Sequence, residues 1–300
     1  MEIFVATITF LLIGMALRHL PDIPAETGNV LNTFVIYISL PALVLLEIPQ
    51  LIFTKNLFVP VLMPWAMLLF SCALILILAR LLKWERSATG CLLLLIPLGN
   101  TSFLGVPMVK AFFGDQAIPY ALFYDQLGSF LALATYGSLI LAIYGTSKDN
   151  PTFTSVVKKV ISFPPFIALI LAVISRVFPY PPIAVSLLEI LAATLVPLVM
   201  IAVGFQLTFQ FERSGIAQLC MGLSIKLIAA PAAALFLCKI AGWEGEAVRV
   251  SIFEAAMPPM ISAGALAISA NLSPALTAAL VGLGIVLSFI TLPMLYQILL

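Results

Sequence analysis

The sequence predicts an all-α membrane protein with ten transmembrane helices, and three observations support this fold class. The chain of 300 residues is 63% hydrophobic and only 9% charged, whereas soluble domains have about 25% charged residues. Its mean hydropathy is +1.19. Apolar stretches of about 20 residues recur along it, each long enough to cross a hydrocarbon core of about 30 Å. Two of these stretches are interrupted by polar residues and prolines.

Ten spans follow from the apolar stretches and their breaks. We expect them at about 3–20, 28–48, 57–82, 88–112, 116–145, 155–177, 183–206, 214–240, 246–270 and 274–299. The connections are short and leave no room for a soluble domain. The longest polar stretch, Gly145 to Lys159, separates two sets of five spans. We therefore expect a first five-helix repeat at 1–145, a linker at 146–154 and a second repeat at 155–300.

Matching features at nearly constant separation indicate that the two halves are repeats. A Pro-containing turn follows Arg18 after the first span and Arg176 after the sixth. Pro41 and Pro197 each lie inside the second span of a half, and a Trp-Glu pair precedes each interrupted span (Trp84-Glu85, Trp243-Glu244). Because five is an odd number, the second copy enters the membrane from the opposite side. The repeats are therefore expected to be inverted, as in many secondary transporters.

Lysine and arginine in the loops predict the orientation. Eight of them follow odd-numbered spans: Arg18, Arg80, Lys83, Arg86, Lys148, Lys158, Lys159 and Arg213. The opposite side holds five: Lys55, Lys110, Arg176, Lys239 and Arg249. The side richer in positive charge normally faces the cytoplasm. We expect both termini outside and the central loop in the cytoplasm, with the protein in the plasma (inner) membrane.

The two interrupted spans predict a binding site at membrane depth. The fourth span contains Gly99-Asn100-Thr101-Ser102-Phe103-Leu104-Gly105-Val106-Pro107, and the ninth contains Met257-Pro258-Pro259. A proline inside a helix removes a backbone hydrogen bond. Lipid cannot satisfy the carbonyl that is freed, so such a break persists only beside protein or a water-filled cavity. Broken helices in corresponding positions of two halves indicate the substrate site of a secondary transporter.

Several polar residues near the breaks are candidates for substrate binding. They are Asn32, Tyr37, Asn100, Thr101, Pro107, Pro258 and Pro259. A helix N-terminus that follows a break directs N–H groups and a positive dipole at the site, which favours an anionic group such as a carboxylate. The alternative is that Ser and Thr side chains simply satisfy the broken backbone. For Asn32 and Tyr37 on the second span, ordinary interhelical hydrogen bonds are the alternative.

Glu254 is the strongest candidate for coupling to an ion. It lies one helical turn before Pro258-Pro259, so its carboxylate can face the carbonyls that the break frees. A carboxylate with unwound carbonyls offers the oxygen ligands that a hard cation such as Na⁺ requires, and the same carboxylate could instead take up a proton. The alternative is a structural carboxylate that holds the two broken helices together.

Three further ionisable residues lie inside spans, where a charge costs at least ~2.5–3.5 kcal/mol. Asp125 and Ser129 are four residues apart and share one face of the fifth helix, which makes both candidates for ion coupling. Asp125 could instead be a structural partner of Lys226 or of a backbone donor. Glu189 is the acid nearest in depth to Lys226, but the sequence does not place them in contact. A structural ion pair or a snorkelling side chain is the alternative for Lys226 and Glu189.

Composition excludes several other classes of function. The net charge is +1 and no basic stripe is present, which argues against nucleic-acid binding. Four cysteines without a CxxC pair and the single His19 form no recognisable metal motif. No Walker A, GxSxG or HExxH motif occurs. We expect no enzyme activity and no cofactor other than Na⁺.

Three stretches resemble signature segments of the auxin efflux carrier family. They are Leu31–Leu43 on the second span, Asn100–Pro107 at the first break and Glu254–Pro259 at the second. The resemblance covers essentially the whole chain and implies the fold of bile acid:sodium symporters. In that fold spans 1, 2, 6 and 7 form a scaffold, and the other spans form a transport domain in which broken helices 4 and 9 cross. The double proline differs from the single proline expected of the family.

The resemblance also implies an activity and a set of ion ligands. Family members move organic anions, auxin in plants and dicarboxylates such as malate or malonate in bacteria, by an elevator-like mechanism and often as homodimers. The sodium ligands of coupled relatives match Asn100, Thr101, Ser129 and Glu254. Ser102 and Asp125 add further oxygens at the same level.

The leading prediction is therefore a secondary active transporter of a small organic anion, coupled to Na⁺ or H⁺. An exchanger of inorganic ions, similar to Na⁺/H⁺ exchangers, is the first alternative. A membrane sensor or anchor that does not transport is the second. The positive charge of Lys226 and the helix N-termini favour the organic anion.

Overall fold

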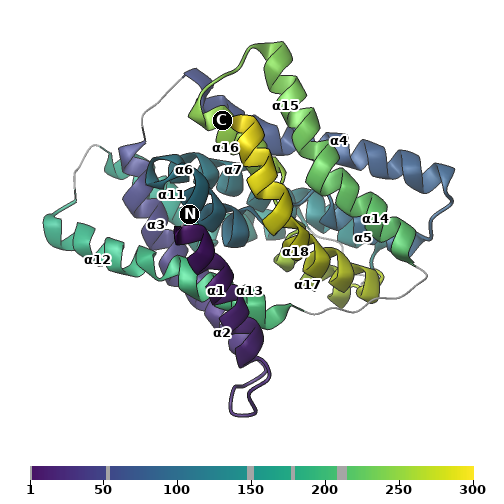
Figure 1. Ribbon diagram of the computed structural model, residues 1–300, viewed down its shortest axis with the longest axis horizontal. Helices are drawn as coiled ribbons and strands as arrows, with labels where there is room; N and C mark the ends of the chain where they lie inside the picture. The colour runs from purple at the N-terminus through teal and green to yellow at the C-terminus, as the bar shows by residue number, and fades with distance from the viewer. Residues whose placement is uncertain (1, 52–54, 147–151, 177–179, 208–214) are drawn as a thin grey trace. The chain divides into compact units, whose positions relative to one another are not determined.

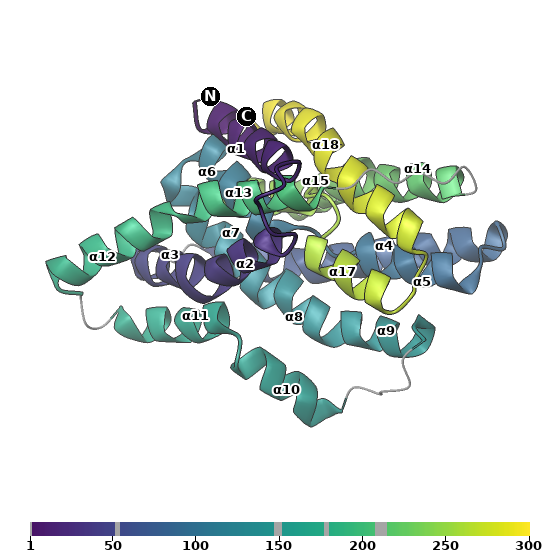
Figure 2. The same ribbon diagram turned by 90° about the horizontal axis from the view of Figure 1, so that it is seen from below.

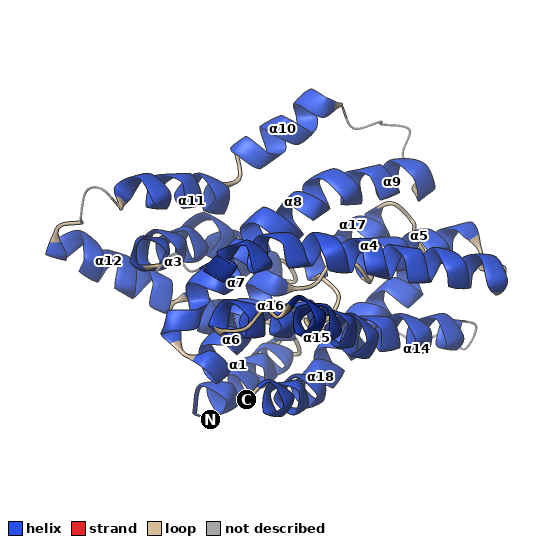
Figure 3. Ribbon diagram, turned by 90° about the horizontal axis from the view of Figure 1, so that it is seen from above, coloured by secondary structure: helices blue, strands red, loops and turns tan. Residues whose placement is uncertain are grey.

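A computed structural model describes residues 2–51, 55–146, 152–176, 180–207 and 215–300. These residues are almost entirely helical (Figure 3), and the only β pairing among them is an isolated antiparallel bridge between Gly99 and Pro259. The centre of the expected linker, Lys148 and Arg213 lie outside the described residues. The chain is thus an all-α multi-pass membrane protein, as predicted.

The helices follow one another in short segments, because π turns and prolines divide the spans (Figure 1). They are α1 (Glu2–Leu17), α2 (Thr27–Phe34), α3 (Leu40–Glu47), α4 (Phe58–Leu81), α5 (Arg86–Leu95), α6 (Val106–Phe113), α7 (Ile118–Tyr124), α8 (Phe130–Ala132), α9 (Ser138–Tyr144), α10 (Phe153–Ile161), α11 (Pro164–Ser175), α12 (Pro182–Ala193), α13 (Leu195–Gln206), α14 (Ile216–Ser224), α15 (Ala230–Ala241), α16 (Glu246–Ala255), α17 (Ile261–Ser269) and α18 (Pro274–Leu299). The π turns are η1 (Val35–Ser39), η4 (Thr101–Gly105), η6 (Asp125–Ser129), η7 (Leu133–Gly137) and η9 (Ile225–Ala229).

Six helices of the described chain are long and apolar enough to cross a membrane, or seven spans if one bent pair is counted. The six are Thr27–Gln50, Phe58–Leu81, Asp115–Tyr144, Pro182–Gln206, Ile216–Ala241 and Pro274–Leu299, which match expected spans 2, 3, 5, 7, 8 and 10. Shorter helices occupy the positions of spans 1, 4 and 9. The expected sixth span is the bent pair α10–α11, whose two parts meet at 62°.

Two compact units make up the chain. The first comprises Met1–Thr54, Ser102–Leu122 and Val157–Leu207, so it contains the spans that the resemblance assigns to the scaffold. Within it α1 packs along α13, and α3 packs against α11 and α12. Small residues allow helix backbones to approach closely in membranes, and glycine does so at the α1–α13 crossing. A Cβ on Gly204 would lie 2.0 Å from the carbonyl oxygen of Leu11.

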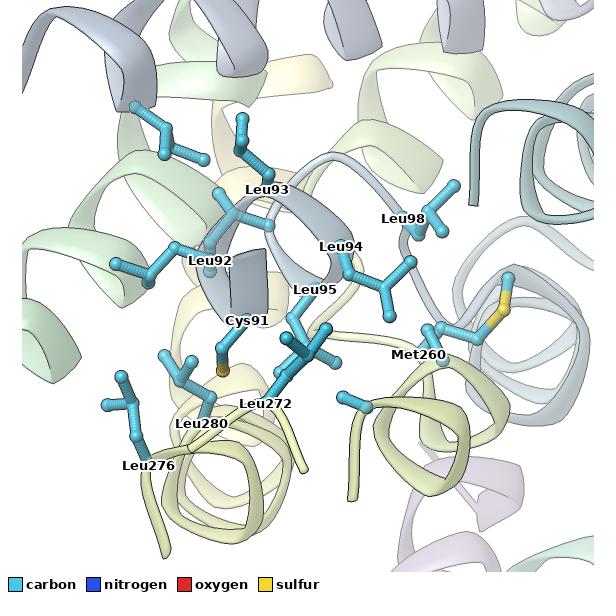
Figure 4. Packing of buried hydrophobic residues seen from close by; sticks show 14 of the residues in the cluster. Cys91, Leu92, Leu93, Leu94, Leu95, Leu98, Met260, Leu272, Leu276 and Leu280 are labelled. Carbon is cyan, nitrogen blue, oxygen red and sulfur yellow. The ribbon is translucent and has the colours of Figure 1, made fainter. Parts of the chain in front are cut away.

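The second unit comprises Lys55–Thr101, Phe123–Val156 and Thr208–Leu300. Its apolar core surrounds α5, whose residues Cys91 to Leu95 are all buried among side chains that include Leu272, Leu276 and Leu280 (Figure 4). A helix that is apolar on every face is buried rather than amphipathic. Because protein surrounds α5, the chain can break directly after it without exposing backbone polar groups to lipid.

Candidate functional site

The breaks that follow α5 and α16 cross each other in the second unit. The backbone N–H of Asn100 donates a hydrogen bond to the carbonyl of Pro258 at 2.8 Å. The N–H of Met260 donates to the carbonyl of Leu98 at 3.0 Å. Each break thus satisfies polar groups that the other leaves free, as buried backbone requires. These bonds use no N–H of Pro258 or Pro259, so the double proline is compatible with the crossing.

Glycine makes room for the crossing on both sides. A Cβ on Gly99 would lie 3.1 Å from Nζ of Lys226 and 3.5 Å from Cβ of Met257. On α18, a Cβ on Gly284 would lie 2.7 Å from Cδ of Pro259. The backbone of α18 therefore lies directly against the second break, and the ammonium of Lys226 lies against the first.

A small cavity adjoins the crossing. It has about 10 Å³ of space for the centre of a water-sized molecule, which is roughly what one water or one small ion requires. Its polar lining comes from Thr101, Tyr124, Ser129, Lys226 and Glu254. Two residues of the predicted ion site, Thr101 and Ser129, thus share a cavity with Glu254.

Glu254 is completely buried, and neither of its carboxylate oxygens has a hydrogen-bond partner in the described part of the chain. The same holds for Nδ2 of Asn100. Two charged side chains act on Glu254, the acid Asp125 and the base Lys226. Among the described residues, however, Lys226 forms no direct ion pair with Glu254. A buried acid without hydrogen bonds is costly, which makes Glu254 the principal candidate of this site.

Asp125 has a different environment from Glu254. Oγ1 of Thr101 donates a hydrogen bond to its Oδ1 at 2.6 Å, and Nε2 of Gln126 donates to its Oδ2 at 2.7 Å. Asp125 therefore fixes Thr101 at the first break. The carboxylate of Glu254 acts electrostatically on Lys226, and both side chains line the same cavity. Glu189, the other acid considered, is exposed on α12.

Three π turns carry the polar residues of this region. Thr101 begins η4, Asp125 and Ser129 begin and end η6, and Lys226 lies in η9. A π turn adds a residue to a helical turn and is frequent at functional sites. Nothing in the apolar pattern of the sequence marks these turns, which is why the proximity of Lys226 to the first break was not predicted.

The structure brings together some of the predicted residues and not others. Asn100, Thr101, Asp125, Ser129, Glu254, Pro258 and Pro259 all belong to the second unit and lie at the crossing or one contact from it. Asn32, Tyr37, Ser102 and Pro107 belong to the first unit. There Nδ2 of Asn32 donates to Oε1 of Gln206 at 3.3 Å, and Tyr37 is 64% exposed. Pro107 is buried in the first turn of α6, and Ser102 is half-buried in η4.

Comparison with known proteins identifies the family. The model of the membrane transport protein family matches residues 1–296. The chain belongs to this family, the auxin efflux carrier family. This auxin efflux carrier family member is 27% identical over 299 residues to an uncharacterized transporter of Methanothermobacter thermautotrophicus, covering 98% of this chain and 96% of the relative. It is also 27% identical over 269 residues to an uncharacterized transporter of Methanocaldococcus jannaschii, covering 86% and 85%. The protein is thus a membrane transporter and not an enzyme.

Proposed function

We propose that this protein is a secondary active transporter of a small organic anion, a carboxylate or dicarboxylate similar to auxin, malate or malonate. The observation that carries the proposal is the buried carboxylate of Glu254. It lies without hydrogen bonds beside the ammonium of Lys226, at the crossing of two broken helices. The family membership supplies the class of activity.

Three features of the crossing favour an anionic substrate. Lys226 provides a buried positive charge, and Nδ2 of Asn100 is a buried donor without a partner among the described residues. Helix α17 begins directly after the second break, and no side chain caps its N-terminus. Free N–H groups and the helix dipole at such an end attract anions.

Na⁺ and H⁺ are both compatible with the groups around Glu254. Glu254, Thr101 and Ser129, three residues with side-chain oxygens, line one cavity, and oxygen ligands suit Na⁺ as a hard cation. The ammonium of Lys226 in the same cavity opposes a second cation there. A proton on Glu254 would instead neutralise the buried acid without requiring any ligands.

The division into two units supports elevator-like movement of a transport domain on a scaffold. Spans 1, 2, 6 and 7 fall in the first unit, and the crossed breaks fall in the second. Within the first unit, span 1 packs on span 7 and span 2 packs on span 6. A two-fold relation between inverted repeats would map span 1 onto span 6 and span 2 onto span 7. The packing of span 1 on span 7 would then correspond to the packing of span 2 on span 6. In this proposal the carrier resides in the plasma (inner) membrane as a homodimer, with its termini outside and the central loop in the cytoplasm.

Thermal stability of the purified protein in detergent tests the binding site. A ligand at 100 times its Kd stabilises the native state by about 2.7 kcal/mol. We expect malate or malonate to raise the melting temperature by several degrees, and either Na⁺ relative to K⁺ or a lower pH to strengthen that shift. Monocarboxylates such as indole-3-acetate form a second arm. If no carboxylate shifts the melting temperature under any of these conditions, the proposed substrate class is wrong.

Gly99→Ala tests the role of Lys226. The added Cβ would lie 3.1 Å from Nζ of Lys226, and the flexible end of that side chain can move away. We expect an unchanged melting temperature and transport about tenfold slower, which corresponds to the loss of about 1.4 kcal/mol of interaction. Gly215→Ala is the control, because the nearest atom to its added Cβ is 3.7 Å away. Normal transport by Gly99→Ala would show that the position of the ammonium does not matter.

A further inference from the structure

Helix α10 (Phe153–Ile161) is strongly amphipathic. At about 100° per residue, Val156, Val157, Val160 and Ile161 occupy one arc of about 140°. Thr154, Ser155, Lys158 and Lys159 occupy the opposite arc, and all four are exposed. On the apolar arc Ile161 is 61% exposed, and the three valines are only half-buried. Protein therefore leaves part of the apolar arc uncovered.

Local sequence fixes both ends of this helix. Oγ1 of Thr152 accepts a hydrogen bond from the backbone N–H of Ser155 at 3.3 Å, which caps the N-terminus. At the other end Phe163 precedes Pro164, and a residue before proline avoids helical geometry. Phe163 is accordingly extended. The helix therefore stops at Ile161, and α11 starts in a new direction, 62° away (Figure 2).

The position of α10 in the chain places it at a membrane surface. Helix α11 is apolar throughout and begins only three residues after α10 ends. If α10 continued α11 through the hydrocarbon, Lys158 and Lys159 would both lie in lipid, where each charge is strongly disfavoured. A bend of 62° instead turns α10 toward the plane of the bilayer. There its apolar arc can enter the boundary of the acyl chains while both lysines meet headgroups.

We propose that α10 is an interfacial helix that binds anionic phospholipid headgroups through Lys158 and Lys159. The charge of the two adjacent lysines selects anionic over neutral lipid, and each lysine near such a surface contributes about fivefold to binding. The chain passes from the second unit to the first between Val156 and Val157. The lipid contact therefore lies on the segment that joins the two units.

Amide hydrogen exchange of the full chain in lipid nanodiscs tests this proposal. The amides of α10 are expected to exchange at least tenfold more slowly in bilayers with 30% phosphatidylglycerol than in pure phosphatidylcholine. In the double variant Lys158→Gln/Lys159→Gln the two bilayers should give rates within twofold of each other. A matched control, Lys83→Gln/Lys239→Gln, removes the same charge from exposed positions outside α10, and should keep the difference. In the wild type, high salt should abolish the difference in exchange rate between the two bilayers.

Two results would overturn the proposal. Equal exchange of wild-type α10 in both bilayers would show that anionic headgroups do not bind it. Strong protection in both bilayers that persists in the lysine double variant would place α10 inside the hydrocarbon, as the first part of a broken span. Ile161→Ser adds a separate check, because a shallowly inserted apolar arc should lose protection in both bilayers when this side chain becomes polar.

Discussion

Glu254→Gln is expected to slow uptake of the organic anion into proteoliposomes by about 100-fold or more. Glutamine keeps the shape of the side chain, but it can neither carry the charge that faces Lys226 nor bind a cation or a coupling proton. Interactions with a charged group contribute about 1.5–3 kcal/mol, and about 2.7 kcal/mol corresponds to 100-fold in rate. The fold should remain intact, because neither oxygen of Glu254 has a hydrogen-bond partner among the described residues.

Glu189→Gln is the matched control for this experiment. It also neutralises an acid within a span, but Glu189 is exposed on α12 and belongs to the other unit. Its uptake should equal that of the wild type, and both variants should elute as folded protein in size-exclusion chromatography. Uptake at the wild-type rate by Glu254→Gln would remove Glu254 from the transport mechanism.

Gly204→Ala is expected to cause the largest loss of stability among single-methyl additions. Its Cβ would lie 2.0 Å from the carbonyl oxygen of Leu11. A Cβ added to Gly14 on the facing helix would likewise lie 2.1 Å from the carbonyl oxygen of Ile201. Because the obstacle is backbone, no rotation of a side chain relieves it, and α1 must move away from α13. Overpacking typically costs 1–3 kcal/mol. We expect about 3 kcal/mol and a melting temperature lower by several degrees.

Gly215→Ala provides the control for added volume and lost glycine flexibility, since its Cβ meets nothing closer than 3.7 Å. Its melting temperature in the same detergent should stay within about one degree of the wild type. If Gly204→Ala were equally stable, α1 and α13 would not be in backbone contact at this crossing.

Much of the candidate site could be predicted from local sequence. Prolines and polar residues in apolar stretches mark both breaks, since few local patterns end a helix so reliably. The distance of one turn between Glu254 and Pro258 predicted a carboxylate beside the second break, and Glu254 lines the cavity that adjoins the crossing. The four-residue spacing of Asp125 and Ser129 placed both on the side of the fifth helix that faces Thr101.

Other features depend on contacts that no local pattern contains. Lys226 and Glu254 come from different spans, so depth alone made Glu189 an equally reasonable partner for Lys226. The π turns at Thr101, Asp125–Ser129 and Lys226 change the helical period without a signal in the apolar pattern. The bend before α11 did have a signal, Phe163-Pro164-Pro165, but the apolar run through it suggested one continuous span.

Uptake of radiolabelled malonate into proteoliposomes distinguishes an organic anion carrier from an inorganic ion exchanger. Uptake should be measured with an inward Na⁺ gradient, with an inward H⁺ gradient and with no gradient. Exchange of Na⁺ for H⁺ should be recorded in the same vesicles. We expect saturable, protein-dependent uptake that one of the two gradients accelerates, that other carboxylates inhibit, and that Glu254→Gln slows by about 100-fold or more. Exchange of Na⁺ for H⁺ without protein-dependent uptake of any carboxylate would contradict it and identify an inorganic ion exchanger.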